Sequence, residues 1–162
     1  MLVNDSHLTT IWVDETDQKI KIIDQRLLPH ELNIVTLSTV KDVEFAIREM
    51  QVRGAPLIGV TAAFGMYVAA LEDSSIEFLD KAADFLIKAR PTAVNLSWAV
   101  KKIKLEISNI NQENRAEHIF NIAKQIREED ISACSKIGDY GCELINSVYD
   151  KKNSTVNILT HC

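Results

Sequence analysis

Short runs of β-favouring residues, separated by polar or turn-forming positions, make up the first forty residues of the chain. Residues 10–13 and 19–23 are rich in β-branched and aromatic side chains, and they flank a polar stretch, residues 14–18, whose composition is typical of a turn. A third run follows Pro29 at residues 33–37. This pattern predicts a small antiparallel β element at the amino-terminal end.

From residue 39 onward, apolar residues recur at spacings of three and four, which predicts amphipathic helices. Thr39 and Asp42 have the spacing of a capping box at the start of the first helix. The expected apolar face of that helix consists of Val43, Ala46, Ile47 and Met50. Residues 55–71 carry no charge and contain many small side chains, so they predict a helix buried in a core rather than a transmembrane span.

Two further amphipathic patterns cover residues 78–89, with Ser74 and Glu77 as the expected cap, and residues 96–107. They are followed by a longer pattern over residues 112–145. The predicted fold class is therefore α+β: a small antiparallel β element followed by a bundle of about five helices.

Glycines interrupt the longest helical pattern at positions 138 and 141, and they predict a bend or break near Gly138. After a polar loop at residues 150–154, the apolar run at residues 156–159 predicts a strand of a kind normally buried inside a parallel sheet. A strand without its neighbours would be an unpaired edge, so we expect the isolated chain to associate in solution.

Composition places the chain among ordinary globular proteins. Its 162 residues are 46% hydrophobic and 25% charged, with a formal net charge of -5. These values exclude a disordered or collagen-like chain, and the length is sufficient for a real hydrophobic core. Because basic residues are not in excess, we expect no nucleic-acid partner bound through charge.

The three cysteines stand at positions 134, 142 and 162, without the close pairs of a structural zinc site or redox motif. Reduced thiols in the cytoplasm are the simplest interpretation, and the first residues lack the pattern of a signal peptide. Cys134 and Cys142 lie within the long helical pattern, where we expect buried, unreactive thiols.

Arg53, Gly54, Ala55 and Pro56 form the first candidate site, because a cation and a conformationally free glycine precede a proline at a candidate first helical position. A helix N-terminus offers unpaired N–H groups and a positive dipole end, and an arginine beside it adds a forked donor suited to phosphate. The alternative is that Arg53 caps the preceding helix and that Gly54 only turns the chain.

Arg90 and Pro91 repeat this arrangement between the next two helices, with Thr92 or Asn95 available as a cap. If the two helix starts converged, their arginines would hold one phosphate from two sides. Helical periodicity does not place distant segments side by side, so the alternative of separate structural roles stays open.

Cys162 follows the apolar run at residues 156–159, at the expected carboxyl end of a strand. Open α/β sheets bind ligands at that edge, and a thiol there would be placed to act as acid, base or nucleophile. The alternative is a buried apolar cysteine.

Four motifs in the same order resemble the amino-terminal half of the methylthioribose-1-phosphate isomerase family, and the resemblance covers almost the whole chain. The motifs are RGAPLIG at 53–59, RPTAVNL at 90–96, IGDYG at 137–141 and ILTHC at 158–162. The resemblance implies a β-plus-helical domain at residues 1–150. Residues 151–162 would then be a linker and the first strand of a truncated Rossmann-like domain.

The resemblance also implies roles for individual residues: Arg53, Gly54 and Ala55 contact the substrate, Arg90 binds its phosphate, and Cys162 is the catalytic thiol. The implied reaction is an aldose-to-ketose isomerisation in methionine salvage, from S-methyl-5-thioribose 1-phosphate to S-methyl-5-thioribulose 1-phosphate. No metal or organic cofactor is expected. The family's catalytic Asp belongs to the second domain, so these 162 residues alone are expected to lack isomerase activity.

The full-length protein is expected to be a cytoplasmic homodimer with no membrane partner. The same superfamily includes ribose-1,5-bisphosphate isomerase, deoxyribose 1-phosphate isomerases, and regulatory subunits of the guanine-nucleotide exchange factor of translation initiation. Isomerisation of ribose 1,5-bisphosphate or 5-deoxyribose 1-phosphate, and a regulatory binding role, are therefore the alternatives. The Arg-Gly-Ala-Pro and His-Cys signatures favour the enzyme.

Overall fold

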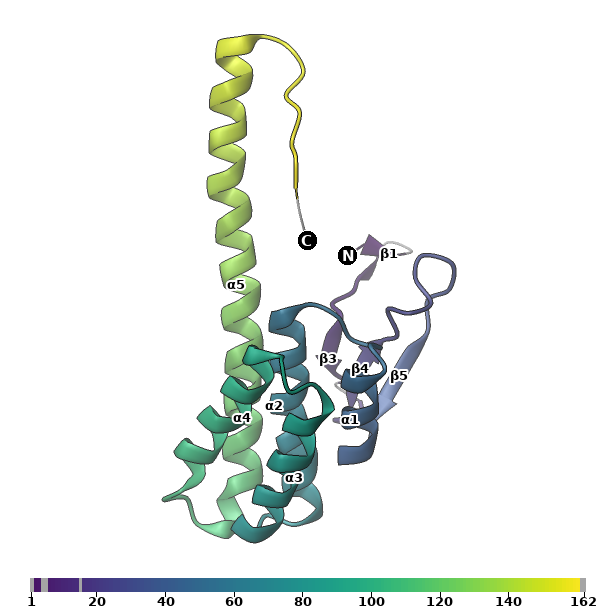
Figure 1. Cartoon of the computed structure of the whole chain (residues 1–162), viewed down its shortest axis with the longest axis vertical. Helices are drawn as coiled ribbons and strands as arrows, with labels where there is room; N and C mark the ends of the chain where they lie inside the picture. The colour runs from purple at the N-terminus through teal and green to yellow at the C-terminus, as the bar shows by residue number, and fades with distance from the viewer. Residues whose placement is uncertain (1, 4–5, 15, 161–162) are drawn as a thin grey trace. The chain divides into compact units, whose positions relative to one another are not determined.

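A three-stranded antiparallel sheet forms the main β part of the structure, a computed structural model that describes residues 2–3, 6–14 and 16–160 (Figure 1). Its strands, in spatial order, are β3 (Ile11–Val13), β4 (Ile20–Ile23) and β5 (Ile34–Leu37). In the central strand, Ile22 pairs with Ile11 on one side and with Val35 on the other. The predicted antiparallel β element is confirmed.

A two-stranded hairpin that the pattern does not predict precedes this sheet. Its strands, β1 (Leu2–Val3) and β2 (Ser6–His7), pair antiparallel. Each strand has two residues, which is too short for an alternation of apolar and polar positions to be recognised.

The first helix, α1 (Val40–Arg48), begins at the capping box that the sequence indicates. The N–H of Asp42 donates to the Thr39 hydroxyl, and the N–H of Thr39 donates to the Asp42 carboxylate. Met50, which we expected on the buried face, is exposed and lies beyond the end of the helix. The other three residues of that face are buried as predicted: Val43, Ala46 and Ile47.

The remaining helices complete the predicted bundle: α2 (Ala55–Glu72), α3 (Ile76–Ala89), α4 (Val94–Ile107) and α5 (Gln112–Lys152). Ser75 caps α3, with its hydroxyl accepting from the N–H of Phe78. The cap expected at Ser74 is wrong, because the Ser74 hydroxyl instead donates to the carbonyl oxygen of Gln112.

Helix α2 is the centre of the first of two compact units, Met1–Arg127 and Glu128–Cys162. Within the described residues, α2 is long and apolar enough to span a membrane by length and composition alone, yet 67% of it is buried inside the protein. Small residues permit this close packing: a Cβ added at Gly65 would lie 2.7 Å from Cγ1 of Val43. The predicted burial of this helix in a core is confirmed. The core joins sheet and helices through residues that include Ile22, Leu37, Ile47, Phe64, Leu86, Ile103 and Ile119.

The second unit contains the later part of α5, which continues without interruption through Gly138 and Gly141. The expected break is wrong, since a glycine inside a helix costs only about 1 kcal/mol and does not by itself end the helix. Cys134 and Cys142 are exposed rather than buried, because almost every residue from 128 to 152 is exposed. A long helical pattern therefore does not guarantee that its apolar residues are covered.

Residues 153–160 are irregular, and the strand predicted at residues 156–159 is not paired with any neighbour among the described residues. A strand is stabilised by the hydrogen bonds of an adjacent strand, and none of the described strands lies in this unit. Leu159 is 99% exposed. The Rossmann-like domain, the boundary at residue 150 and the association of the isolated chain stay predictions.

Candidate functional site

The start of α2 is shaped by Gly54, its N-cap residue. Gly54 has φ of 104°, a backbone conformation that residues with a side chain rarely adopt. A Cβ added there would meet nothing within 4 Å, so the backbone angle rather than crowding requires glycine. Arg53, Gly54 and Ala55 are all exposed, which leaves this turn accessible to a ligand.

The first turn of α2 has amide groups suited to an anion. Ala55 is the first helical residue and Pro56 the second, one position later than expected for the proline. Among the described residues, no side chain caps this end, and the first turn contains no acidic residue. The N–H groups of Ala55 and Leu57 therefore stand at the positive end of the helix dipole without a helical partner.

Arg53 is bound to a neighbouring loop and not to the end of α1. Its Nη2 donates to the carbonyl oxygen of Gln25 over 2.9 Å. The C-cap position of α1 is occupied by Glu49, so the alternative in which Arg53 caps that helix is wrong. The contact with Gln25 uses one of the five N–H donors of the guanidinium and leaves the others for a ligand.

Arg90 lies between α3 and α4, where it is the C-cap residue of α3. Its carbonyl oxygen accepts from the N–H of Ala93 over 2.9 Å, and Ala93 is the N-cap of α4. Neither Thr92 nor Asn95 caps α4, because no side chain in the described part of the chain does so. The Arg90 side chain is half-buried, with no recorded hydrogen bond or ion pair to the described residues.

The two helix starts lie side by side. Gly59, one turn into α2, packs against Asn95 in the first turn of α4. A Cβ on Gly59 would lie 3.0 Å from the Asn95 carbonyl oxygen and 3.2 Å from its Cβ. Figure 1 shows α2 and α4 beginning at the same end of the first unit. The convergence that periodicity could not establish is therefore present, and it brings two uncapped helix starts together.

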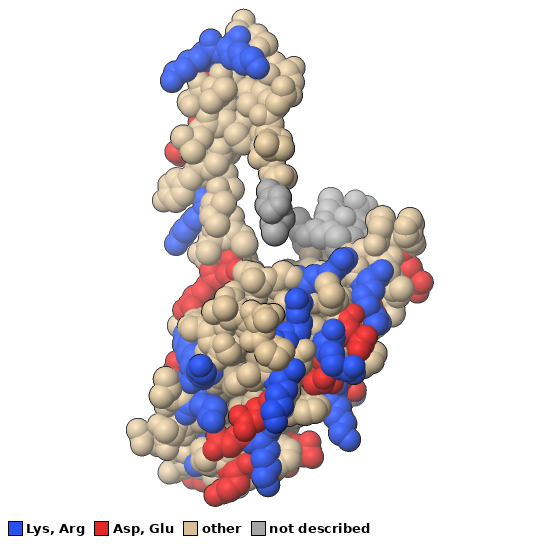
Figure 2. Space-filling model, viewed as in Figure 1, with Lys and Arg blue, Asp and Glu red and all other residues tan. Residues whose placement is uncertain are grey.

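Some charged side chains elsewhere on the first unit form ion pairs with neighbours. Figure 2 shows acidic and basic side chains interspersed over one face. Lys104 pairs with Asp80 over 2.8 Å, and Arg48 pairs with Glu44 over 2.8 Å. Like several lysines of this unit, among them Lys41, Lys81 and Lys88, Arg90 has no ion-pair partner among the described residues, so its charge is available to an external anion.

A buried carboxylate behind the start of α2 was not singled out from the sequence. Asp24 is 1% exposed, and its oxygens accept from Nε and Nη2 of Arg26 over 2.9 and 2.7 Å. Gln51 Nε2 donates to the same carboxylate over 2.7 Å. The hydrogen bonds from Arg26, which outweigh the effect of burial, and that from Gln51 lower the pKa of Asp24 to about 2. The available signal was an Asp directly after a predicted strand, with an Arg two positions later.

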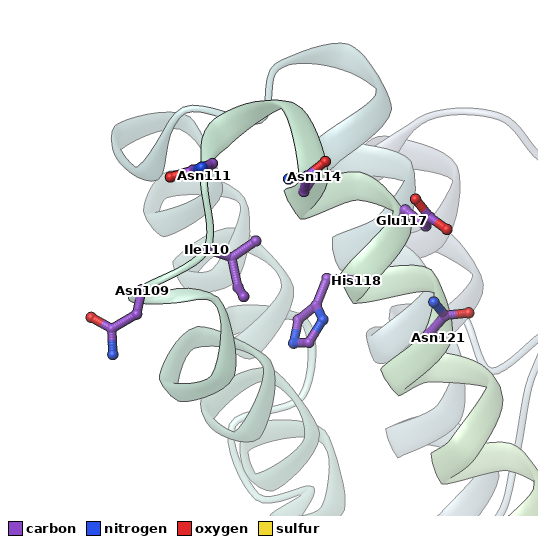
Figure 3. A pocket seen from close by; sticks show the side chains of 7 residues that line it. All are labelled: Asn109, Ile110, Asn111, Asn114, Glu117, His118 and Asn121. Carbon is purple, nitrogen blue, oxygen red and sulfur yellow. The ribbon is translucent and has the colours of Figure 1, made fainter.

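A pocket of about 330 Å³ lies beyond the carboxyl end of α4, at the opposite end of that helix from Arg90 (Figure 3). His118 contributes to its wall, with Nε2 4.0 Å from Oε2 of Glu106. Among the described side chains that line this pocket there is no Lys or Arg, so it lacks the cationic donors that favour a phosphate ester. Its polar lining consists of Asn109, Asn111, Asn114, Glu117, His118 and Asn121.

Cys162 lies outside the described residues. Its predicted place at the carboxyl end of a strand and its catalytic role therefore stay predictions. The roles of Arg53, Gly54, Ala55 and Arg90 in substrate binding also stay predictions, although the helix starts that carry these residues are adjacent.

Comparisons with known proteins extend the four-motif resemblance. A sequence model described as the initiation factor 2 subunit family matches residues 51–162. Curated proteins named methylthioribose-1-phosphate isomerase align with the whole chain, at 45% identity for the protein of Sinorhizobium medicae and 40% for that of Escherichia coli. The chain covers 45% and 44% of those proteins, so it spans about half the length of these relatives. The resemblance identified from the motifs is confirmed.

Two crystal structures share the fold. Translation initiation factor eIF-2B, subunit delta, from A. fulgidus has a TM-score of 0.77 and 34% identity, over 85% of this chain and 42% of that one. The 5-methylthioribose 1-phosphate isomerase from Pyrococcus horikoshii has a TM-score of 0.76 and 36% identity, over 84% of this chain and 40% of that one. Because the two names belong to different classes of function, the fold alone does not choose between them.

Proposed function

The chain belongs to the initiation factor 2 subunit family, and from this premise we propose that it supplies the phosphate-binding part of a pentose 1-phosphate isomerase. The substrate we propose is S-methyl-5-thioribose 1-phosphate, converted to S-methyl-5-thioribulose 1-phosphate in the cytoplasm. The names of the curated relatives support this proposal. The observation that carries it is the packing of Gly59 on Asn95, which joins two arginine-bearing helix starts.

Each part of this arrangement has a separate task in holding the substrate. Arg90, without a recorded partner among the described residues, donates a forked pair of hydrogen bonds to the phosphate oxygens. The free amides at the start of α2, beginning with Ala55, bind the same group at the positive end of the helix dipole. Arg53 adds a second cation from the opposite side. A phosphate held in this way keeps the reacting sugar carbons in place.

The substrate explains why additional acid–base groups are required. The phosphate ester at C1 prevents the spontaneous ring opening that ordinary aldoses undergo, so a general acid must protonate the ring oxygen as its bond to C1 breaks. A proton then leaves C2, another is added at C1, and the C2 hydroxyl gives up its proton, which produces the C2 carbonyl of the ketose. In this proposal Cys162 is one member of the acid–base pair. Positioned groups of this kind typically contribute about 10²- to 10⁴-fold to the rate.

The decisive test compares the 162-residue chain with a fusion of that chain to the remaining carboxyl-terminal part of the Sinorhizobium medicae relative. Conversion of S-methyl-5-thioribose 1-phosphate is measured for both, with ribose 1,5-bisphosphate and 5-deoxyribose 1-phosphate as competing substrates. We expect turnover by the fusion and none by the chain alone, because the second catalytic group belongs to the missing part. A folded fusion that converts none of the three sugars contradicts the proposal.

Arg90→Gln in the fusion tests the phosphate contact directly. A hydrogen bond to a charged group contributes about 1.5–3 kcal/mol, so kcat/KM should fall at least tenfold. Lys88→Gln is the matched control: it removes the same charge from an exposed side chain two residues earlier and should leave kcat/KM unchanged within twofold. Equal losses of kcat/KM in both variants would mean that the overall positive charge of this segment, and not a contact made by Arg90, affects the reaction.

A regulatory binding role is the second candidate, and the likeness to eIF-2B subunit delta favours it. In that case the fusion would fold and assemble without isomerising any sugar phosphate. Light scattering on the same fusion also tests the proposed homodimer, with a mass of one chain as the contrary result.

A further inference from the structure

The connection between α1 and α2 has a conformation that its own residues do not favour. Met50 has φ of 60° and Gly54 has φ of 104°, so the backbone enters the left-handed region twice within five residues. Methionine rarely adopts this conformation, and it persists only where surrounding contacts hold it. The position of Arg53 and the direction in which α2 begins therefore depend on contacts from elsewhere in the fold.

Those contacts come from the loop that follows β4. The N–H of Gln25 donates to the carbonyl oxygen of Gln51 over 2.9 Å. In return, Nη2 of Arg53 donates to the carbonyl oxygen of Gln25 over 2.9 Å. The Gln51 side chain, 6% exposed, donates to the carboxylate of Asp24 over 2.7 Å. Three hydrogen bonds thus fasten residues 51–53 to Asp24 and Gln25.

Asp24 is itself fixed to the sheet. Its N–H donates to the carbonyl oxygen of Asn33 over 2.9 Å, and its carboxylate accepts from both Nε and Nη2 of Arg26. Among the described residues, no buried side-chain nitrogen or oxygen lacks a hydrogen-bond partner. The Asp24 side chain is 2% exposed and that of Arg26 39%, and the position of this carboxylate directly behind an exposed arginine and helix start favours a role in positioning.

We propose that Asp24 is a positioning residue for the anion site: it holds Gln51, and through Gln51 it keeps Arg53 and Gly54 in the conformation that presents them to a phosphate group. Asp24 does not touch the ligand. This inference rests on the proposed function, because it assumes that the start of α2 binds the phosphate of the substrate.

The chemistry of the contact requires an ionised carboxylate. Both Asp24 oxygens accept, and all the donors around them are N–H groups of Arg26 and Gln51. An asparagine would replace one acceptor with an NH₂ group facing another donor, so at least one of these bonds would be lost. Asp24→Asn therefore releases the connection without changing the size of the side chain.

The test is an NMR titration of the 162-residue chain with inorganic phosphate, following the amide signals of Gly54 and Ala55. We expect these signals to shift in the unmodified chain, and the affinity to fall at least fivefold in Asp24→Asn and in Gln51→Leu. Asp14→Asn is the matched control, because Asp14 is also a paired carboxylate in the β part, bound to Lys21 over 2.6 Å but remote from residues 51–53. Its affinity should match that of the unmodified chain.

The outcomes separate the two proposals. If phosphate shifts neither signal in the unmodified chain, the anion site of the proposed function fails. If it shifts them and both variants bind phosphate as tightly as the unmodified chain, the positioning role of Asp24 is overturned. Should Asp24→Asn fail to fold, Gln51→Leu tests the positioning role instead. It removes only the hydrogen bond between the Gln51 side chain and the carboxylate of Asp24.

A fourth variant distinguishes positioning from simple stabilisation. Asp24→Asn combined with Gln51→Glu moves the carboxylate to the other side of the same hydrogen bond. We expect this exchange to restore phosphate affinity to within about twofold of the unmodified chain, because the hydrogen bond between residues 24 and 51 forms again. An exchange variant that recovers thermal stability but no affinity would overturn the inference.

Discussion

The starts of α2 and α4 carry similar residues but are held in different ways. Arg53, before α2, donates to the carbonyl oxygen of Gln25, and its turn is tied through Gln51 to a buried carboxylate. Arg90, before α4, is half-buried with no recorded side-chain partner among the described residues. One helix start is fixed by surrounding contacts, whereas the other presents an arginine that is able to adjust to a ligand.

The backbone conformation also differs between the two helix starts. Gly54 turns the chain into α2 with a positive φ, while Ala93 enters α4 with φ of -80° and ψ of 93°, which any residue adopts. The connection with unusual backbone angles is the one that receives external hydrogen bonds. A site with one rigid and one adaptable cation would combine a preformed anion position with closure on the substrate.

The packing of Gly59 on Asn95, which joins the two starts, should be the most sensitive point. Gly59→Ala places a Cβ 3.0 Å from a backbone oxygen, so the helices must move apart by a few tenths of an ångström, at an expected cost of up to about 3 kcal/mol. Gly138→Ala is the matched substitution in α5, where the Cβ meets nothing within 4 Å. It should stabilise its helix by about 0.5–1 kcal/mol, because alanine has the higher helix propensity.

Urea unfolding measures the loss of stability in Gly59→Ala, and thermal loss of helical circular dichroism measures the gain in Gly138→Ala. Equal effects of the two substitutions would refute this account of the packing.

Acid should weaken the contacts that fix the start of α2 and leave the start of α4 unaffected. Because the pKa of Asp24 is about 2 in the folded protein and near 3.8 when unfolded, its stabilising effect is complete above about pH 4 and lost as pH falls towards 2. The difference corresponds to about 2 kcal/mol. We expect the stability advantage of the unmodified chain over Asp24→Asn to shrink across that interval in thermal melts. An advantage that stays constant from pH 5 to pH 2.5 would show that ionisation of Asp24 is not involved.

The start of α4 should accept a capping side chain, with a smaller effect on stability than the changes above. Ala93→Ser supplies the hydroxyl that α4 lacks and should stabilise the chain by about 1 kcal/mol. Ala93→Asp should stabilise it similarly at pH 7 but also weaken phosphate binding, because the new negative charge at the start of α4 repels the phosphate that Arg90 binds. Thermal melts and a phosphate titration of both variants test this. Unchanged phosphate affinity in Ala93→Asp would place the anion away from α4.

Local signals explain which parts of the fold were predictable. The Thr39 and Asp42 capping box depends on residues three apart, and it is present as expected. The cap at Ser74 was misplaced by one residue, because Ser75 offers the same hydroxyl and only the contact of Ser74 with Gln112 decides between them. The exposure of Cys134 and Cys142 was also unpredictable, since periodicity reports an apolar face but not whether another element covers it.

The amino-acid sequence by itself determined the antiparallel strands, the buried character of α2 and the two arginine-bearing helix starts, because each follows from residues close together in the chain. Only the tertiary structure decided that the starts converge at Gly59 and Asn95, and that Asp24 anchors the turn before α2. These contacts join residues that are 27 or more positions apart. Local periodicity contains no information about such distances, so the geometry of the site depends on how the helices and the sheet pack.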